Sequence, residues 1–260
     1  MKVVILAGGY GTRISEESYL KPKPMIELGG QPILWHIMKS YSHYGYNEFI
    51  ICCGYKANVI KEYFANYYLY RSDMTFDFAN NGYMTIHNNI AEPWRVTIVD
   101  TGLDTLTGGR VKRVAKYLKN ETFMLTYGDG VCDVNINELV KYHHKHGKLA
   151  TITAVRPSSR FGNLTINEKN MVSNFAEKRQ ENSGYINGGF MVLEPNFLDH
   201  ISGDETILEH EPLEYAANSN NLIAYIHNGF WSCMDTMRDK QHLESLLATG
   251  KAPWEVWKND

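Results

Sequence analysis

The first 26 residues constrain the fold of this chain more than any other stretch. An apolar run from Val3 to Ala7 leads directly into Gly8-Gly9-Tyr10-Gly11-Thr12-Arg13, and Lys21-Pro22-Lys23-Pro24-Met25 follows soon after. The run is typical of a buried strand. Three glycines in four positions permit a sharp turn and expose backbone N–H groups to phosphate oxygens, because no Cβ blocks their approach. With Arg13 and Lys23 as fixed cations, the stretch predicts a strand that delivers a loop suited to a polyanion.

Two better-known glycine loops do not fit this stretch. A P-loop has Lys-Ser or Lys-Thr directly after its last glycine, whereas Thr12-Arg13 follows Gly11 here. The dinucleotide fingerprint, counted from Gly9, requires a small residue at position 14, which is Ile14. The glycines alone leave open a tight strand-to-helix turn that binds nothing. The cations that follow favour an anion site.

Composition bounds the class of protein. The chain has 260 residues, of which 43% are hydrophobic and 21% charged, as expected for one large globular domain. Its formal net charge of −3 argues against nucleic-acid binding through bulk electrostatics. A small anionic ligand remains possible if cations gather locally.

No sequence signal indicates a membrane or secreted protein. The apolar run at the start is too short for a signal peptide, and no stretch approaches the roughly 18 apolar residues of a membrane span. We therefore expect a cytoplasmic protein without membrane contact. Of the four cysteines, only Cys52 and Cys53 are close in sequence, and adjacent cysteines do not match a CxxC spacing. All four are expected to be reduced thiols.

Apolar runs alternate with helical patterns through residue 155, which predicts an α/β fold with crossover units on a mostly parallel sheet. Strands are expected at 2–6, 48–53, 94–99, 122–127 and 149–155, and helices at 32–44, 58–68, 110–119 and 135–146. Residues 71–93 are read as a polar stretch. Ligands of such sheets bind beyond the carboxyl ends of the strands, where the glycine loop and strand 122–127 both end.

The pattern changes after residue 156. Shorter strands are expected at 161–166, 171–177, 185–193 and 222–228, with helices at 206–218 and 236–248, which favours a smaller mixed or antiparallel region. No linker separates the halves, so we predict one domain over 1–260, with a nucleotide-binding core in 1–155 and a second half in 156–260 that adds another wall to the cleft.

Two aspartates are candidate metal ligands. Asp129 follows strand 122–127 and lies between Gly128 and Gly130, and Asp235 follows an apolar run directly before a helix. Mg²⁺ takes oxygen ligands and commonly combines one or two carboxylates with substrate phosphates and water. Asp129 could instead be a turn aspartate, and Asp235 a helix N-cap.

Two further polar segments are candidate binding loops. Lys178 lies after a predicted strand, and Asn187-Gly188-Gly189 opens another; together they suit a sugar phosphate, although the local sequence of Lys178 alone favours an ordinary charged turn. The loop from Thr101 to Arg110 precedes a helix. It could contact a nucleotide or only cap that helix.

An ordered series of motifs resembles the sugar-1-phosphate nucleotidyltransferases over essentially the whole chain: GGYGTR, KPKPM, GGQPILWHIMKSY, ICCGYK, TGGR, TYGDG, RFG, NGGF and FWSCMDT. The resemblance implies a Rossmann-like sheet core with a smaller β-rich sugar-binding region. It also implies the reaction: an oxygen of the sugar phosphate attacks the α-phosphorus of a nucleoside triphosphate and releases pyrophosphate. No protein nucleophile is required.

The overall match implies CTP and glucose 1-phosphate as substrates, CDP-glucose as product and Mg²⁺ as cofactor. It further implies a homo-oligomer, with a hexamer suggested by the family, and a role in deoxysugar and O-antigen supply for lipopolysaccharide. Physical chemistry leaves the base open, because a few hydrogen bonds in a folded loop decide among CTP, UTP and dTTP. A nucleotide-sugar-dependent glycosyltransferase and a nucleotide-binding protein without turnover are the alternatives from other classes.

Residue roles also follow from the resemblance. Arg13 and Lys23 are the implied catalytic cations, Arg13 for the departing pyrophosphate and Lys23 between the reacting phosphates. Asp129 and Asp235 are the implied metal ligands. Sugar-phosphate contacts are implied for Lys178, Asn187 and Gly188, although Arg179 stands where many relatives have proline. Nucleotide contacts are implied for Leu6, Ala7, Gly8, Gly9, Tyr10, Gly11, Thr12, Arg13, Lys23, Thr105, Arg110 and Gly128.

Overall fold

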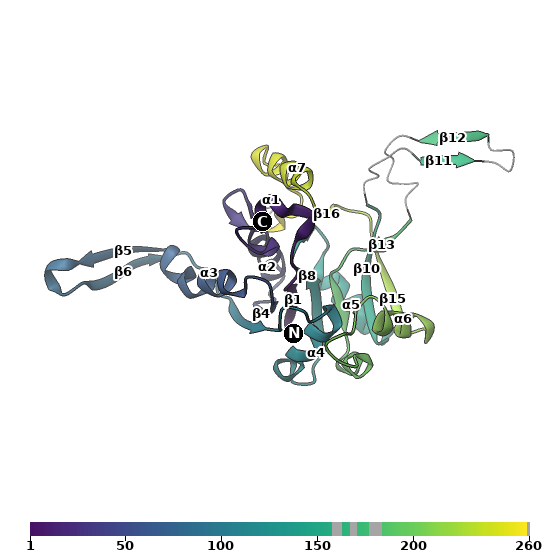
Figure 1. Ribbon diagram of the computed structural model, residues 1–260, viewed down its shortest axis with the longest axis horizontal. Coiled ribbons are helices and arrows are strands. Elements are labelled where there is room, and N and C mark those ends of the chain that lie inside the picture. Colours follow the sequence, from purple (N-terminus) through teal and green to yellow (C-terminus); the bar gives the residue numbers. More distant parts are fainter. Residues whose placement is uncertain (158–162, 167–170, 177–183, 259–260) are drawn as a thin grey trace.

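The centre of the molecule is one eight-stranded sheet (Figure 1). The computed structural model describes residues 1–157, 163–166, 171–176 and 184–258. In spatial order the sheet contains β13 (Ile186–Asn187), β10 (Ala150–Val155), β14 (Met191–Leu193), β8 (Phe123–Tyr127), β1 (Val3–Ala7), β4 (Glu48–Cys53) and β7 (Arg95–Asp100), and β15 (Leu222–His227) also pairs with β10.

The two halves of this sheet differ in strand direction. β1, β4, β7 and β8 are mutually parallel, whereas β14 pairs antiparallel with both β8 and β10, and β13 pairs antiparallel with β10. β10 and β15 form a further parallel pair. The predicted mostly parallel α/β sheet with a mixed second region is therefore confirmed. The long strand expected at 185–193 is instead two short strands, because Gly189 and Phe190 between them adopt positive φ angles of 74° and 48°.

Helices cover both faces of the sheet, which explains its uninterrupted apolar strands. In β1, Val3 and Ile5 belong to one hydrophobic cluster and Val4 and Leu6 to the other. α2 packs on the first cluster and α4 on the second. The α-helices are α1 (Ser15–Ser18), α2 (Ile33–His43), α3 (Ala57–Tyr70), α4 (Thr107–Leu118), α5 (Ile136–His146), α6 (Glu211–Asn218) and α7 (Met237–Ala248).

Short 3₁₀ helices and two-stranded sheets complete the described fold. The 3₁₀ helices are η1 (Thr12–Ile14), η2 (Lys23–Met25), η3 (Phe78–Asn80), η5 (Pro195–His200) and η6 (Val256–Lys258). The two-stranded sheets pair β2 (Glu27–Leu28) with β3 (Gln31–Pro32), β5 (Ser72–Asp77) with β6 (Tyr83–Asn89), β9 (Gly130–Cys132) with β16 (Trp231–Cys233), and β11 (Asn163–Ile166) with β12 (Val172–Ala176).

No helix or strand was expected in the polar stretch at 71–93, but most of it forms the β5–β6 hairpin. The hairpin projects from the body beyond α3 (Figure 1), so all of its residues are exposed or only partly buried and no apolar periodicity marks it. Asn81 and Gly82, with φ angles of 59° and 74°, lie in its turn. An Asn-Gly pair is a strong hairpin signal, and it was available in the sequence.

The remaining sequence expectations concern cysteines and membranes. All four cysteines are free thiols, and Cys52 and Cys53 are buried in β4 as expected. Among the described residues, no helix is both long enough and apolar enough to cross a membrane.

Candidate active site

A cleft of about 600 Å³ opens at the carboxyl ends of β1 and β8. These strands are parallel neighbours, with Leu6 opposite Tyr127, so the segments that follow them lie side by side. The Gly128 N–H donates to the Leu6 carbonyl at 2.9 Å. The predicted glycine loop and the predicted metal carboxylate therefore share one cleft, as the sheet topology required.

All of the predicted nucleotide-contact residues line this cleft. They are Leu6, Ala7, Gly8, Gly9, Tyr10, Gly11, Thr12, Arg13, Lys23, Thr105, Arg110 and Gly128, together with Asp129. Gly11 has a φ of 67°, a left-handed conformation that lets the loop turn into η1. The turn carries Arg13 back to the cleft mouth.

Lys23 lies at the centre of an ionic cluster. Its Nζ donates to Asp129 Oδ2 at 2.6 Å and to Asp235 Oδ1 at 2.5 Å, and the Lys23 side chain is only 10% exposed. Arg13 donates from Nη1 to the other oxygen of Asp235 at 2.6 Å, although its side chain is 71% exposed. Four of the predicted residues, from four separate segments, thus meet at one place.

The cluster favours the charged forms of Lys23 and Asp235. Burial alone would raise the pKa of Asp235, but the hydrogen bond and charge of Lys23, aided by Arg13, outweigh burial and hold that pKa below 3.8. Burial opposes the charged form of Lys23 as well, yet Asp129 and Asp235 raise its pKa above 10.5. At neutral pH the ammonium is therefore charged and faces the carboxylate of Asp235.

The two aspartates also satisfy the requirements of a divalent-metal site. One oxygen from each converges on the same point, now held by the Lys23 ammonium, and hard oxygen donors suit Mg²⁺. Asp129 and Asp235 keep 29% and 14% side-chain exposure, which leaves room for phosphate and water ligands. Asp235 is not a helix N-cap, because Thr236 holds that position at α7.

Arg110, for which a nucleotide contact was expected, is hydrogen-bonded to oxygens of the protein itself. Its guanidinium is almost fully buried and donates to the carbonyls of Cys53, Gly102 and Leu103 and to Thr101 Oγ1, at 2.7–3.2 Å. The arrangement ties the loop that follows β7 to the end of β4. Within the cleft wall, Arg110 supports this loop through neutral oxygens.

Tyr10 links the same loop to the glycine loop. Its hydroxyl donates to Asp104 Oδ1 at 3.0 Å, and its ring lies 5.5 Å from that of Tyr55. Asp104 lines the cleft as well. It lies in the segment that the sequence singled out, although it carried no distinguishing signal of its own.

The predicted sugar-phosphate residues differ in placement. Asn187 donates from Nδ2 to the hydroxyl of Tyr127, which lines the cleft, at 3.2 Å. Gly188 is buried with both backbone groups paired: its N–H donates to Thr153 and its carbonyl accepts from the Trp231 indole. Lys178 lies outside the described residues. Tyr127 was missed as a site residue, although its place directly before Gly128-Asp129 was a usable signal.

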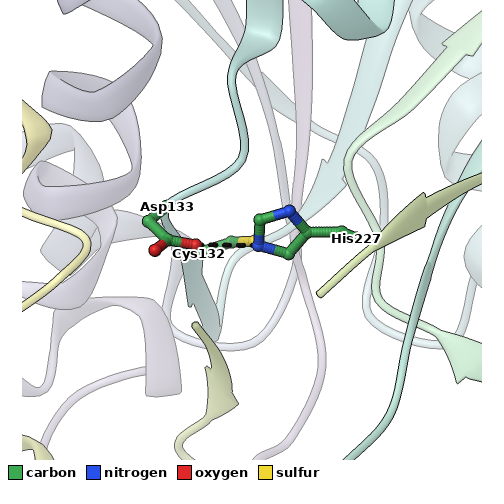
Figure 2. A group of neighbouring side chains, drawn as sticks. All are labelled: Cys132, Asp133 and His227. Atoms are coloured by element: carbon green, nitrogen blue, oxygen red, sulfur yellow. Dashed lines mark hydrogen bonds and ion pairs between the residues drawn. The ribbon is translucent and has the colours of Figure 1, made fainter. Parts of the chain in front are cut away.

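A second group of ligand-type side chains, Cys132, Asp133 and His227, lies away from the cleft lining. They point toward one another (Figure 2), with ligand atoms within 4.8 Å. Asp133 Oδ1 lies 2.7 Å from His227 Nε2 and accepts the Phe230 N–H at 2.8 Å. Asp133 therefore fastens the turn after β15 beside β9. Because β16 follows this turn and leads to Asp235, the group helps to place that carboxylate.

Comparisons with known proteins agree with this architecture. Glucose-1-phosphate cytidylyltransferase of Salmonella typhi is 56% identical over 259 residues, covering 99% of this chain and all of the relative. Mannose-1-phosphate guanyltransferase of Saccharomyces cerevisiae is 28% identical over 95% of this chain and 64% of its own length. A UDP-glucose pyrophosphorylase structure has a TM-score of 0.69 at 16% identity, covering 96% of this chain and 98% of that one.

The structure of HddC from Yersinia pseudotuberculosis, at 22% identity and a TM-score of 0.68, covers 95% of this chain and 99% of that chain and has the same fold. The model of the nucleotidyl transferase family matches residues 2–239, a span that includes the glycine loop and both aspartates. With a full-length relative at 56% identity and this cleft in place, the chain belongs to the nucleotidyl transferase family.

Proposed function

We propose that this enzyme transfers a cytidylyl group from CTP to α-D-glucose 1-phosphate and releases CDP-glucose and pyrophosphate. The Salmonella typhi relative named for this activity matches nearly the whole chain. The product would serve deoxysugar and O-antigen biosynthesis. The ionic cluster of Lys23, Arg13, Asp129 and Asp235 at the end of the glycine loop is the observation that carries the chemical part of the proposal.

This cluster suits a reaction between two anions. The sugar phosphate is already a nucleophile, so the protein's task is to hold it in line with the α-phosphorus and to balance charge. Lys23, whose ammonium stays protonated, lies between the reacting groups and lowers their repulsion. Arg13 is exposed at the cleft mouth, where it can pair with pyrophosphate as charge builds on that leaving group.

Backbone donors of residues 8–13 bind the triphosphate, and Thr105 and Arg110 support contacts to the base. Asn187 and Gly188 belong to the sugar side, and Lys178 is proposed to contact the sugar phosphate. In this division, residues 1–155 form the nucleotide-binding core, and residues 156–260 bind the sugar and complete the metal site through Asp235.

Mg²⁺ is the proposed cofactor, held by Asp129 and Asp235. When bound, it would stabilise the charge on the triphosphate. The convergence of two carboxylate oxygens supports this assignment, as does the incomplete burial of both side chains.

A homo-oligomer is the proposed assembly. The β5–β6 hairpin with its turn carries large apolar side chains into solvent, including Phe78 at 84% and Tyr83 at 70% exposure. Apolar side chains this exposed on a projecting arm suit contact with a second copy of the chain. Sedimentation velocity of the whole protein tests this, and a monomer at micromolar concentration contradicts it.

Pyrophosphate release tests the function. Purified enzyme is supplied with glucose 1-phosphate, Mg²⁺ and CTP, UTP, dTTP or GTP in turn, and CTP is expected to give the highest kcat/KM. A preference for UTP or dTTP would refute the cytidylyl assignment and keep the chemistry. Consumption of CDP-glucose with an acceptor and without pyrophosphate would instead indicate a glycosyltransferase.

A substitution at Asp129 tests the assignment of the metal site. Asp129→Asn is expected to keep the fold and to lose at least about 100-fold in turnover, a magnitude typical of losing one charge-stabilising group. Calorimetric titration with Mg²⁺ and CTP should show weaker binding of the metal. Wild-type turnover in this variant would contradict the site.

A further inference from the structure

A chain of hydrogen bonds joins the sugar side of the cleft to its nucleotide side through a residue without an assigned role, Glu209. The Tyr127 hydroxyl donates to Glu209 Oε1 at 2.5 Å and accepts from Asn187 Nδ2 at 3.2 Å. Glu209 Oε2 accepts from Thr107 Oγ1 at 2.7 Å. Thr107 and Tyr127 both line the cleft, and Thr107 is the first residue of α4.

The residues at the two ends of this series of hydrogen bonds, Asn187 and Thr107, determine which group donates in each bond. Asn187 Oδ1 accepts the Gly189 N–H at 2.8 Å, so Nδ2 is the atom that faces Tyr127. The Tyr127 oxygen therefore accepts from Asn187 and gives its own proton to Glu209. At the other end, Thr107 Oγ1 accepts the Leu208 N–H at 2.9 Å, so its proton also goes to Glu209.

Glu209 must consequently accept at both oxygens, which a carboxylate does and an amide does not. A glutamine here would turn one N–H toward a hydroxyl that already holds its own proton and an N–H donor. One donor would then lose its acceptor, at the cost of an unpaired polar group in a partly buried place. The chemistry of the position therefore selects a carboxylate.

We propose that Glu209 is a positioning residue for the sugar phosphate: it orients the Tyr127 hydroxyl, and through it aims the Asn187 amide at a hydroxyl of the hexose. Nδ2 carries a second N–H for that hydroxyl, since Tyr127 is its partner among the described residues. The bond from Thr107 fastens the same carboxylate to the start of α4, on the nucleotide side. The inference rests on the proposed function.

Steady-state kinetics with both substrates varied test the proposal. Glu209→Gln is expected to raise the KM for glucose 1-phosphate by about tenfold, as for one unpaired polar group, and to leave the KM for CTP within about twofold. Asp204→Asn is the matched control, because Asp204 lies in the same loop and its carboxylate pairs at the surface with Arg113, at 2.6 Å. It is expected to leave both KM values unchanged.

A double-mutant cycle tests whether Glu209 acts through Tyr127. Tyr127→Phe keeps the carboxylate and removes the donor, so it should raise the same KM by itself, whatever Glu209→Gln does to folding. The double variant should then resemble Tyr127→Phe alone. Additive effects, equal rises in both KM values, or a control that behaves like Glu209→Gln would overturn the proposal. A wild-type enzyme without turnover on glucose 1-phosphate and CTP would instead refute the proposed function.

Discussion

Replacing Lys23 by methionine should distinguish the contribution of the Lys23 ammonium to folding stability from its contribution to turnover. Methionine keeps a similar apolar stem and removes the ammonium, which leaves Asp129 and Asp235 facing each other without the cation that now lies 2.5–2.6 Å from each. Removing one partner of a buried ion pair costs about 3–5 kcal/mol. Because both carboxylates keep some contact with water and Arg13 remains beside Asp235, we expect about 2–3 kcal/mol of lost unfolding free energy.

In a chain of this size, that loss corresponds to a fall in melting temperature of about 5–10 °C. Mg²⁺ should reverse it, because two carboxylates released from the ammonium bind a cation that the unfolded chain does not. Mg²⁺ at about 100 times its Kd returns about 2.7 kcal/mol. Activity should not return: pyrophosphate release should stay at least about 100-fold below wild type, the loss typical of one charge-stabilising donor.

The measurements are thermal unfolding with and without Mg²⁺ and pyrophosphate release from CTP and glucose 1-phosphate. Lys21→Met is the control, since Lys21 lies in the same segment and pairs with Glu27 at 2.8 Å on a more exposed surface. Surface pairs contribute little, so its melting temperature and turnover should remain near those of wild type. Near wild-type turnover in Lys23→Met, or the same melting change in both variants, would refute this account of the cluster.

Two stability predictions follow from buried groups. Burial lowers the pKa of His36 and of His143 below 6.5, so the unfolded chain takes up these protons first as pH falls. The unfolding free energy should therefore decline below pH 6.5, by at most about 1.4 kcal/mol per pH unit for each histidine, and equal urea midpoints at pH 7.5 and 5.5 would contradict this. Gly189 has a φ of 74°, and a Cβ there would lie 3.0 Å from the Tyr127 ring. Gly189→Ala should lower the unfolding free energy measured in urea by more than about 1 kcal/mol. The loss should exceed that of the control Gly250→Ala, because Gly250 has a similar φ of 66° but no atom within 4 Å of the added Cβ. Equal losses in the two variants would refute the contact with Tyr127.

Much of the fold follows from local sequence. The apolar run of β1 and the runs of β4 and β8 are buried on both faces, so their composition alone identified them as strands of a covered sheet. The β5–β6 hairpin was not predicted, because it projects from the body and buries neither face continuously. Apolar periodicity in a sequence arises where one face of a helix or strand is buried, so it does not reveal an element that is not buried.

The residue types of the site can be read from local sequence: a glycine turn after β1, cations at positions 13 and 23, and carboxylates that follow two strands. Which of these groups meet depends on the folded chain. Lys23 and Asp235 are 212 positions apart in sequence and come together because β9 pairs with β16 and β1 with β8. The same holds for Glu209, which lies 82 positions from the tyrosine it orients. Local sequence specifies turn and burial preferences, whereas contacts between distant side chains depend on strand order and on the direction of each hydrogen bond, which exist only once the chain has folded.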